Sequence, residues 1–287
     1  MKKLLTILSL IFAGCGGGGN VINMKLPDSI SAVRKEMDYL LITSKTERKW
    51  LLITEEGKKF DSGEFNCLPL KNMAFSEEFL IFCGREEELK VEVYVQKTSR
   101  NSLALTGEIP GIFTGSVARE GEIRITAYKG GETKFYEVNH GIHELFSHEG
   151  MCVPVNLTSF ICDGILYPDE IEVPESGIVF PDQVSGPLLC SGREIKVIKD
   201  GVFISFLTMK SQPLSFLPFE DKMVFFDIAG YARIINRKTL EETSVSCGSY
   251  PVSVTATGEE RVYVLNELNP SITVLNLKEL KVVKTIW

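Results

Sequence analysis

The chain has 287 residues, a length that suits one large closed all-β domain or two ordinary domains. Its formal net charge is −7, and lysine and arginine form no block along it. A nucleic-acid-binding protein needs a basic patch, so this balance argues against a nucleic-acid partner.

The N-terminus has the pattern of a bacterial export signal. Two lysines precede an apolar run over residues 4–13, which is too short to span a bilayer because a spanning helix takes about 20 residues. The next residues complete the stretch 12–15, which resembles the bacterial lipobox, although Phe12 stands where leucine is usual. The resemblance implies that residues 1–14 are a signal peptide and that Cys15 becomes a lipid-bearing N-terminus. An ordinary signal peptide cut elsewhere is the alternative.

Residues 15–20 contain four consecutive glycines after the cysteine and are expected to form a flexible tether. Several acyl chains, at about 0.8 kcal/mol per buried methylene, would make membrane attachment effectively permanent. In families that export lipoproteins through two membranes, an aspartate after the cysteine often marks inner-membrane retention, and this chain has Gly16 there. An exported, lipid-anchored protein is therefore predicted, on the periplasmic side of the outer membrane or at the cell surface.

From residue 21 onward, the chain repeats a unit of β-strands. Apolar runs that suit the second strand of each unit begin at intervals of 28 to 44 residues. These runs start near Tyr39, Phe79, Ile123, Phe160, Leu188, Met223 and Val262. Seven units are predicted. Six units are the alternative, because the interval from Phe160 to Leu188 is short enough that one unit must have lost strand length.

The clearest unit is the last one. Four runs rich in β-branched residues are separated by charged, glycine or proline turns, which predicts a four-stranded meander. The runs are 251–256, 261–266, 271–276 and 281–286. The preceding unit has the same order, with Pro213 placed 38 residues before Pro251.

These motifs carry a specific resemblance. The sequence from Gly248-Ser-Tyr-Pro251 through Arg261-Val-Tyr-Val-Leu-Asn266 to Ile286 resembles a YVTN-type β-propeller repeat, with Leu265 in place of the threonine that names the family. The resemblance implies a propeller of four-stranded blades, which bury both of their faces against their neighbours. We expect residues 21–287 to form this one domain.

The strand pattern supports an all-β fold. Continuous apolar runs such as 38–43, 50–54 and 79–83 suit strands that are covered on both faces. No segment has a convincing helical period over more than two turns. The last unit holds all four of its own strands, so residues 21–26 are either an additional strand at its edge or a linker.

Six cysteines remain after Cys15. Cys152 and Cys162 lie on consecutive predicted strands, where antiparallel pairing would place them opposite each other, so an oxidising compartment favours a disulfide between them. Alternatively, Cys83, Cys162 and Cys190 recur at the same point of three units, shortly before a glycine, as small buried residues required by packing.

All three histidines fall in one stretch. His140, His143 and His148 lie beside Glu144 and Glu149, and such clusters can bind zinc or another transition metal. Their spacing matches no standard zinc signature, so a solvated outer surface of a blade is the alternative. Asp163, Asp182 and Asp227 fall near strand ends and could collect around calcium at a channel mouth, although isolated aspartates usually form turns.

The sequence contains no nucleophile elbow, phosphate-binding loop or metalloprotease histidine pair. The leading hypothesis is a monomeric, non-enzymatic, membrane-anchored scaffold without a cofactor that binds an envelope protein, peptide or polymer. The alternative is a lactonase-like or quinone-dehydrogenase-like propeller enzyme with a metal or cofactor in its channel. Small, apolar segments predicted to be innermost argue against it. They are 31–33, 73–75, 114–116, 153–155, 214–216 and 252–254.

A third hypothesis is an assembly factor resembling the propeller lipoprotein that helps to insert outer-membrane barrels. The docking repeats of that family, which contain tryptophan, are not evident in this sequence.

Overall fold

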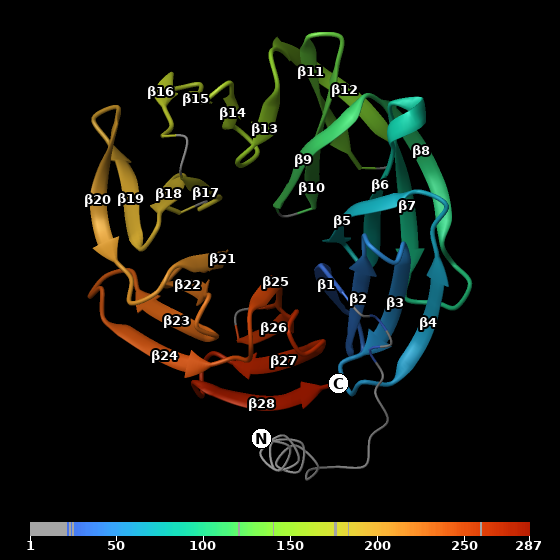
Figure 1. The fold of residues 1–287 in the computed structure, drawn as a ribbon. Helices are drawn as coiled ribbons and strands as arrows, with labels where there is room; N and C mark the ends of the chain where they lie inside the picture. The colour runs from blue at the N-terminus through green and yellow to red at the C-terminus, as the bar shows by residue number, and fades with distance from the viewer. Residues whose placement is uncertain are drawn as a thin grey trace, which may run out of the picture.

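A computed structural model describes residues 22, 24, 26–119, 121–139, 141–174, 177–182, 184–258 and 260–287. Seven four-stranded antiparallel sheets are arranged around a central axis as the blades of a β-propeller (Figure 1). Each blade is a meander of four consecutive strands, with its first strand innermost. The predicted all-β fold and its seven blades are confirmed, and the count of six is wrong.

The strands of the first four blades are as follows. Blade 1 contains β1 (Ser29–Arg34), β2 (Asp38–Ser44), β3 (Lys49–Thr54) and β4 (Lys59–Glu64). Blade 2 contains β5 (Leu68–Phe75), β6 (Glu78–Arg85), the 3-10 helix η1 (Glu86–Glu88), β7 (Lys90–Lys97) and β8 (Ala104–Pro110). Blade 3 contains β9 (Ile112–Arg119), β10 (Glu122–Lys129), β11 (Glu132–Val138) and β12 (Ile142–Glu149). Blade 4 contains β13 (Cys152–Pro154), β14 (Phe160–Cys162), β15 (Ile165–Tyr167) and β16 (Ile171–Glu172).

The last three blades complete the ring. Blade 5 contains β17 (Ile178–Phe180), β18 (Leu188–Ser191), β19 (Glu194–Lys199) and β20 (Val202–Thr208). Blade 6 contains β21 (Pro213–Pro218), β22 (Lys222–Asp227), β23 (Tyr231–Asn236) and β24 (Glu242–Ser246). Blade 7 contains β25 (Pro251–Thr257), β26 (Arg261–Asn266), β27 (Ser271–Asn276) and β28 (Lys281–Ile286). No helix within the described residues is long and apolar enough to cross a membrane.

The predicted second strands all fall in the second strand of a blade, from β2 to β26. The short strands of blade 4 explain the short interval between Phe160 and Leu188. Blade 4 is built from strands of only two or three residues, so it spans less sequence than its neighbours. One blade has therefore lost strand length without being lost from the ring.

The side chains of a continuous apolar run pack into two hydrophobic cores, one on each face of the blade. In β2, Leu40 and Ile42 pack with Tyr263 of blade 7, while Leu41 between them packs with Phe79 of blade 2. Successive side chains of a strand point to opposite faces, and each blade here is covered on both faces. A strand in this position is therefore apolar at successive residues. A strand covered on only one face would instead alternate between apolar and polar residues.

Blade 7 contains all four of its own strands, as predicted, and among the described residues none before β1 forms a strand that completes it. The chain before β1 is nevertheless fixed to that blade. The Ile22 N–H donates a hydrogen bond to the Trp287 carbonyl at 3.3 Å, and the side chains of Ile22 and Met24 are buried in the core shared by blades 1 and 7. Neither of these two residues belongs to a strand, so they join blades 1 and 7 through side-chain packing.

Polar contacts also join blade 1 to blade 7. The Asp38 carboxylate is 1% exposed and accepts hydrogen bonds from the Thr257 hydroxyl at 2.6 Å and the Tyr263 hydroxyl at 2.5 Å. Beside them, the Arg261 guanidinium forms an ion pair with Glu55. We call these five residues the closure cluster, because they connect the two ends of the chain across the last seam of the ring.

Candidate binding face

The two faces of the ring differ in which loops they carry. In each antiparallel blade, the start of the first and third strands and the end of the second and fourth strands lie at the same edge. We call the face formed by these edges the entry face. Loops on a rigid scaffold are where binding residues concentrate, so the entry face and its opposite are the two candidate surfaces.

Every blade exposes a large apolar side chain on the entry face. These side chains are 42–69% exposed, and Leu268 in the β26–β27 loop is the most exposed of them. They are Leu26, Leu89, Ile112, Met151, Ile178, Ile228 and Leu268. A single exposed apolar residue needs no explanation, but a ring of them on one face is a feature of interaction surfaces.

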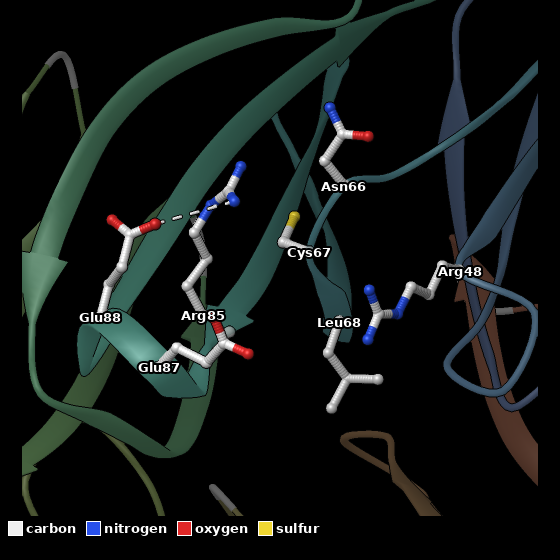
Figure 2. Close-up of a pocket in the computed structure, with 8 residues that line it drawn as sticks. Arg48, Asn66, Cys67, Leu68, Arg85, Glu87 and Glu88 are labelled. Atoms are coloured by element: carbon white, nitrogen blue, oxygen red, sulfur yellow. Dashed lines mark ion pairs between the residues drawn. The ribbon is translucent and has the colours of Figure 1, made fainter.

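A groove crosses the entry face over blade 2. Its first hollow has a volume of about 240 Å³ and lies between Arg48 of the β2–β3 loop and Arg85 at the end of β6 (Figure 2). A second hollow of about 230 Å³ shares Leu68, Gly84 and Arg85 with the first and continues to Ile112 at the start of β9. The groove is polar toward blade 1 and apolar toward blade 3, which suits an amphipathic ligand such as a peptide segment.

Five charged residues beside this groove are paired with one another. Arg85 forms a hydrogen-bonded ion pair with Glu92, whose other carboxylate oxygen accepts a 2.8 Å hydrogen bond from the Tyr94 hydroxyl. Burial alone would raise the pKa of Glu92, but the hydrogen bonds from Tyr94 and Arg85 outweigh it and lower that pKa. Lys90 contacts Glu88 at 2.8 Å and Glu108 at 2.9 Å. These groups are satisfied by one another, so they shape the groove and are poorly placed for acid–base catalysis.

Two thiols lie beneath the same groove. The Cys83 thiol donates a hydrogen bond to Cys67, which lowers the pKa of Cys67 and raises that of Cys83. Cys67 is only 2% exposed, however, and a reactive cysteine needs access as well as a lowered pKa. Cys83 and Cys190 are buried free thiols, as the packing alternative predicted, and Cys67 and Cys247 are too. The pairing of Cys67 with Cys83 was not predicted, because Cys67 lies in the connection before β5, Cys83 lies in β6, and no motif links the two.

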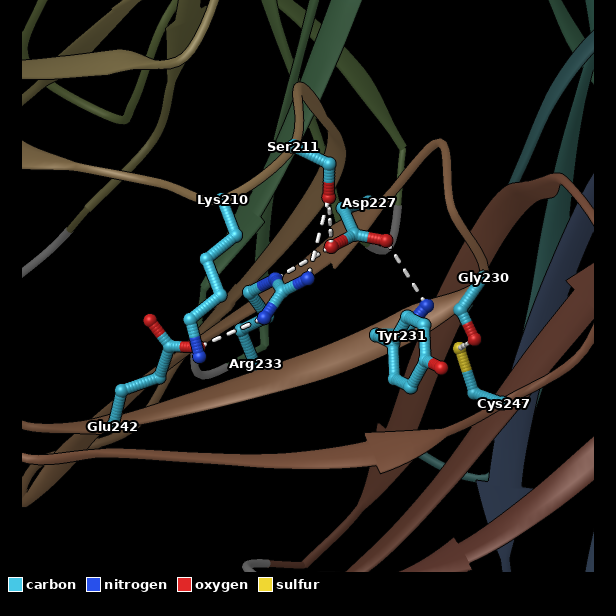
Figure 3. A network of polar contacts seen from close by, with 8 residues as sticks. All are labelled: Lys210, Ser211, Asp227, Gly230, Tyr231, Arg233, Glu242 and Cys247. Atoms are coloured by element: carbon cyan, nitrogen blue, oxygen red, sulfur yellow. Dashed lines mark hydrogen bonds and ion pairs between the residues drawn. The ribbon is translucent and has the colours of Figure 1, made fainter.

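A second polar cluster lies in blade 6 (Figure 3). The buried Asp227 carboxylate accepts hydrogen bonds from Arg233 at 2.5 Å and from the Ser211 hydroxyl, and its other oxygen accepts one from the Tyr231 N–H at 3.0 Å. Arg233 also donates to Glu242 at 2.8 Å. A buried carboxylate with this many partners is a structural anchor for the β22–β23 turn.

The three aspartates considered for calcium are not brought together. Asp182 lies in the β17–β18 loop on the opposite face, where Arg237 binds it with both terminal nitrogens at 2.8 Å. Asp227 lies at the entry face in blade 6, and Asp163 follows β14 in blade 4. Each therefore serves its own turn or blade.

The predicted disulfide and histidine residues lie at the junction of blades 3 and 4. Cys152 and Cys162 are direct partners in the β13–β14 register, and a disulfide joins them. His143 and His148 lie near opposite ends of β12, the outermost strand of blade 3, and His143 is exposed. Of the two, His148 alone belongs to a group of metal-ligating side chains within the described residues, together with Cys152 and Cys162. His140 and Cys15 lie outside the described residues.

The opposite face has a larger hollow. It has a volume of about 520 Å³ and lies between blades 2 and 3, with Phe75, Val95 and Ile142 in its wall. Ile142 reaches into the space above Gly107, where a Cβ atom would lie 2.4 Å from its side chain. Like the entry-face groove, this hollow is lined by strand ends and by the loops that join them, and it follows the packing seam between the two blades.

The fold defines this protein as a seven-bladed β-propeller. The sequence matches no protein-family profile and no curated protein. In contrast, 893 chains of solved structures match its fold. One is Sqt1 of Saccharomyces cerevisiae, with 9% identity over 92% of this chain and 86% of that chain and a TM-score of 0.57.

Two bacterial structures are also similar. A protein of unknown function from Bacteroides caccae has 12% identity over 86% of this chain and 93% of that chain, with a TM-score of 0.54. PorZ of Porphyromonas gingivalis, an essential surface component of the type-IX secretion system, has 8% identity over 88% of this chain but only 37% of its own, with a TM-score of 0.59. Identities this low establish a shared fold and leave function to be argued from the surface.

Proposed function

We propose that this protein is a lipid-anchored, non-enzymatic binding scaffold of the bacterial envelope, and that its entry face binds a protein or peptide partner. The observation that carries the proposal is the ring of exposed apolar side chains on the entry face, one or more from every blade, two of which (Leu89 and Ile112) line the groove over blade 2. Burying such a ring against a partner would supply apolar contact area, and the paired charges beside it would form a polar rim.

The charged groups favour binding over catalysis. Around the groove and in the blade 6 cluster, buried carboxylates are neutralised by arginines through direct hydrogen bonds. A catalytic carboxylate or nucleophile instead needs a free lone pair within reach of substrate. The lactonase-like or quinone-dehydrogenase-like alternative needs ligands that converge on the channel, and the one group of three potential metal ligands among the described residues lies at the seam of blades 3 and 4.

The proposed anchor places the entry face near a membrane. Ile22 follows Cys15 by seven positions, a stretch that spans at most about 25 Å when fully extended. Ile22 is hydrogen-bonded to Trp287, directly after β28 ends at the entry face. The rim of blades 1 and 7 would therefore stay within a short distance of the lipid surface, and a partner in the same membrane would be within reach.

Replacing Cys15 by serine is expected to abolish incorporation of labelled palmitate and to move the protein from the membrane fraction to the soluble fraction. The reason is that the sulfur of Cys15 would carry the lipid that holds the protein to the bilayer. Cys190→Ser is the matched control, because it removes a different cysteine and should leave the protein in the membrane fraction. Membrane association that survives in C15S would contradict the lipid anchor.

The binding role is tested by site-specific photo-crosslinking in the envelope. A crosslinking residue in place of Leu268 or Ile112 is expected to give a discrete partner band, while one in place of Val202 or Leu280 on the opposite face should give none. Adding Leu89→Asp should reduce the entry-face band by about tenfold or more, since a buried charge at an interface disrupts it. Equal labelling of both faces, or no labelling of either, would overturn the proposal.

A further inference from the structure

The seam between blades 3 and 4 brings together three side chains that metals favour. His148 comes from β12, Cys152 opens β13 and Cys162 closes β14. One ligand atom from each lies within 4.8 Å of those of the other two. The cysteines are buried and joined by a disulfide, and the histidine is half-buried beside them.

The local backbone explains why these residues converge. Thr133 on β11 is the register partner of His148, and its hydroxyl donates a hydrogen bond to the Gly150 carbonyl at 2.8 Å and accepts one from the Cys152 N–H at 2.9 Å. Thr133 therefore fixes the turn between β12 and β13. Because the chain folds back over four residues, His148 and Cys152 approach the same point from two blades, and Cys162 faces Cys152 across the ladder.

The imidazole of His148 is held in place by a backbone contact and by two aromatic rings. His148 Nδ1 lies 2.7 Å from the Glu149 carbonyl oxygen, which can only accept a hydrogen bond. The proton is therefore on Nδ1, and the lone pair is on Nε2. Metal-binding histidines are typically fixed in this way by a carbonyl on their other ring nitrogen. The ring also packs against Phe160 and Tyr167, with centroid distances of 5.4 and 4.7 Å.

We propose that Cys152, Cys162 and His148 form a zinc site when the disulfide is reduced. Reduction adds two electrons and two protons to the disulfide, supplied by a dithiol that is itself oxidised to a disulfide. Zinc then binds as both thiols lose their protons to solvent. The disulfide and the metal exclude each other, because the same two sulfurs make both, so the site reports the redox state of its surroundings.

The chemistry of the site suits zinc. Two thiolates and a neutral imidazole form a common donor set for zinc, and the complex with Zn²⁺ has no net charge, so burial costs little. Tetrahedral zinc at about 2.3 Å from each sulfur would separate the sulfurs by about 3.8 Å. Side-chain rotation on paired strands can provide this separation, and a fourth position remains for water or a partner's ligand.

The test is direct metal binding by the mature chain. After reduction with a phosphine, which takes up oxygen from water as the disulfide becomes two thiols, we expect about one equivalent of zinc per chain by elemental analysis. Co²⁺ used as a probe should give a thiolate charge-transfer band. The oxidised protein should bind neither ion. Failure of the reduced protein to bind, or equal binding by both forms, would overturn the site.

Variants separate this site from the other thiols. His148→Ala leaves the disulfide intact and should weaken zinc binding by about tenfold or more, while His143→Ala on the same strand should leave it unchanged. Zinc binding that survives the double change Cys152→Ser and Cys162→Ser would assign the metal to the Cys67–Cys83 pair and contradict the proposal. Thermal unfolding of each variant shows that it is folded before metal is added.

Discussion

Replacing Asp38 by alanine is expected to lower the free energy of unfolding by about 3 to 5 kcal/mol. Asp38 is buried at the seam between blades 1 and 7 and accepts hydrogen bonds from Thr257 and Tyr263, which lie 219 and 225 residues later in the chain. Its loss would leave the Thr257 hydroxyl buried without its acceptor, and the Tyr263 hydroxyl with only a 3.5 Å contact to Glu55, at the seam that closes the ring. Chemical denaturation measured by tryptophan fluorescence gives the free energy.

The coupling across the seam can be isolated by a double-mutant cycle. Tyr263→Phe alone should cost about 1 to 2 kcal/mol, and combined with Asp38→Ala it should cost less than the sum of the two changes, since they break the same contact. Glu279→Ala, an exposed carboxylate on blade 7, is the control and should change stability little. Fully additive effects of the two seam changes would mean that the hydrogen bond does not hold blades 1 and 7 together.

Replacing Gly230 by alanine is the second change expected to have a large effect, at about 2 to 5 kcal/mol. Gly230 has a φ of +84°, a conformation that costs other residues about 1 to 2 kcal/mol. A Cβ atom at this position would lie 1.9 Å from the Gly248 carbonyl oxygen, so the backbone of the β24–β25 connection would have to move. Chemical denaturation measures the consequence.

Gly201→Ala is the matched control for this change. Gly201 also has a positive φ, +76°, but a Cβ atom there would meet nothing within 4 Å. It should show the backbone cost alone, about 1 to 2 kcal/mol. If the two substitutions are equally destabilising, the close approach of the two backbones at Gly230 contributes nothing to stability.

Blade 4 shows how far local sequence reasoning reaches. The short interval before Leu188 left a choice between seven and six units, because three-residue strands such as β14 carry little periodic signal. Cys152 and Cys162 were a stronger indication of the structure of this blade. A disulfide between two consecutive strands requires only that these two strands pair in the register that places the cysteines opposite each other. The histidine cluster was a weaker guide, because β12 separates His143 from His148 along its length.

The entry face illustrates the opposite situation. Leu26 and Leu268 are separated by most of the chain and share no motif, and each alone is an ordinary exposed apolar residue. They lie on one face because every blade repeats the same meander, so the first strand of each blade starts at the entry face. The repeat was readable from the sequence, whereas the surface that it builds became visible only once the loops were placed.

The all-β class, the meander unit and the positions of the second strands could all be read from the sequence. These depend on short-range properties, namely β-branched runs, turn residues and apolar character at successive positions. The folded structure was needed to see how the ring closes, why Asp38 is buried and which thiols are neighbours. It was also needed to see that His148 meets Cys152 and Cys162. The contacts of Asp38 join residues more than 200 positions apart, and such contacts leave no local pattern in the sequence. The meeting of His148 with the two cysteines is closer in sequence, but it depends on how blades 3 and 4 pack against each other.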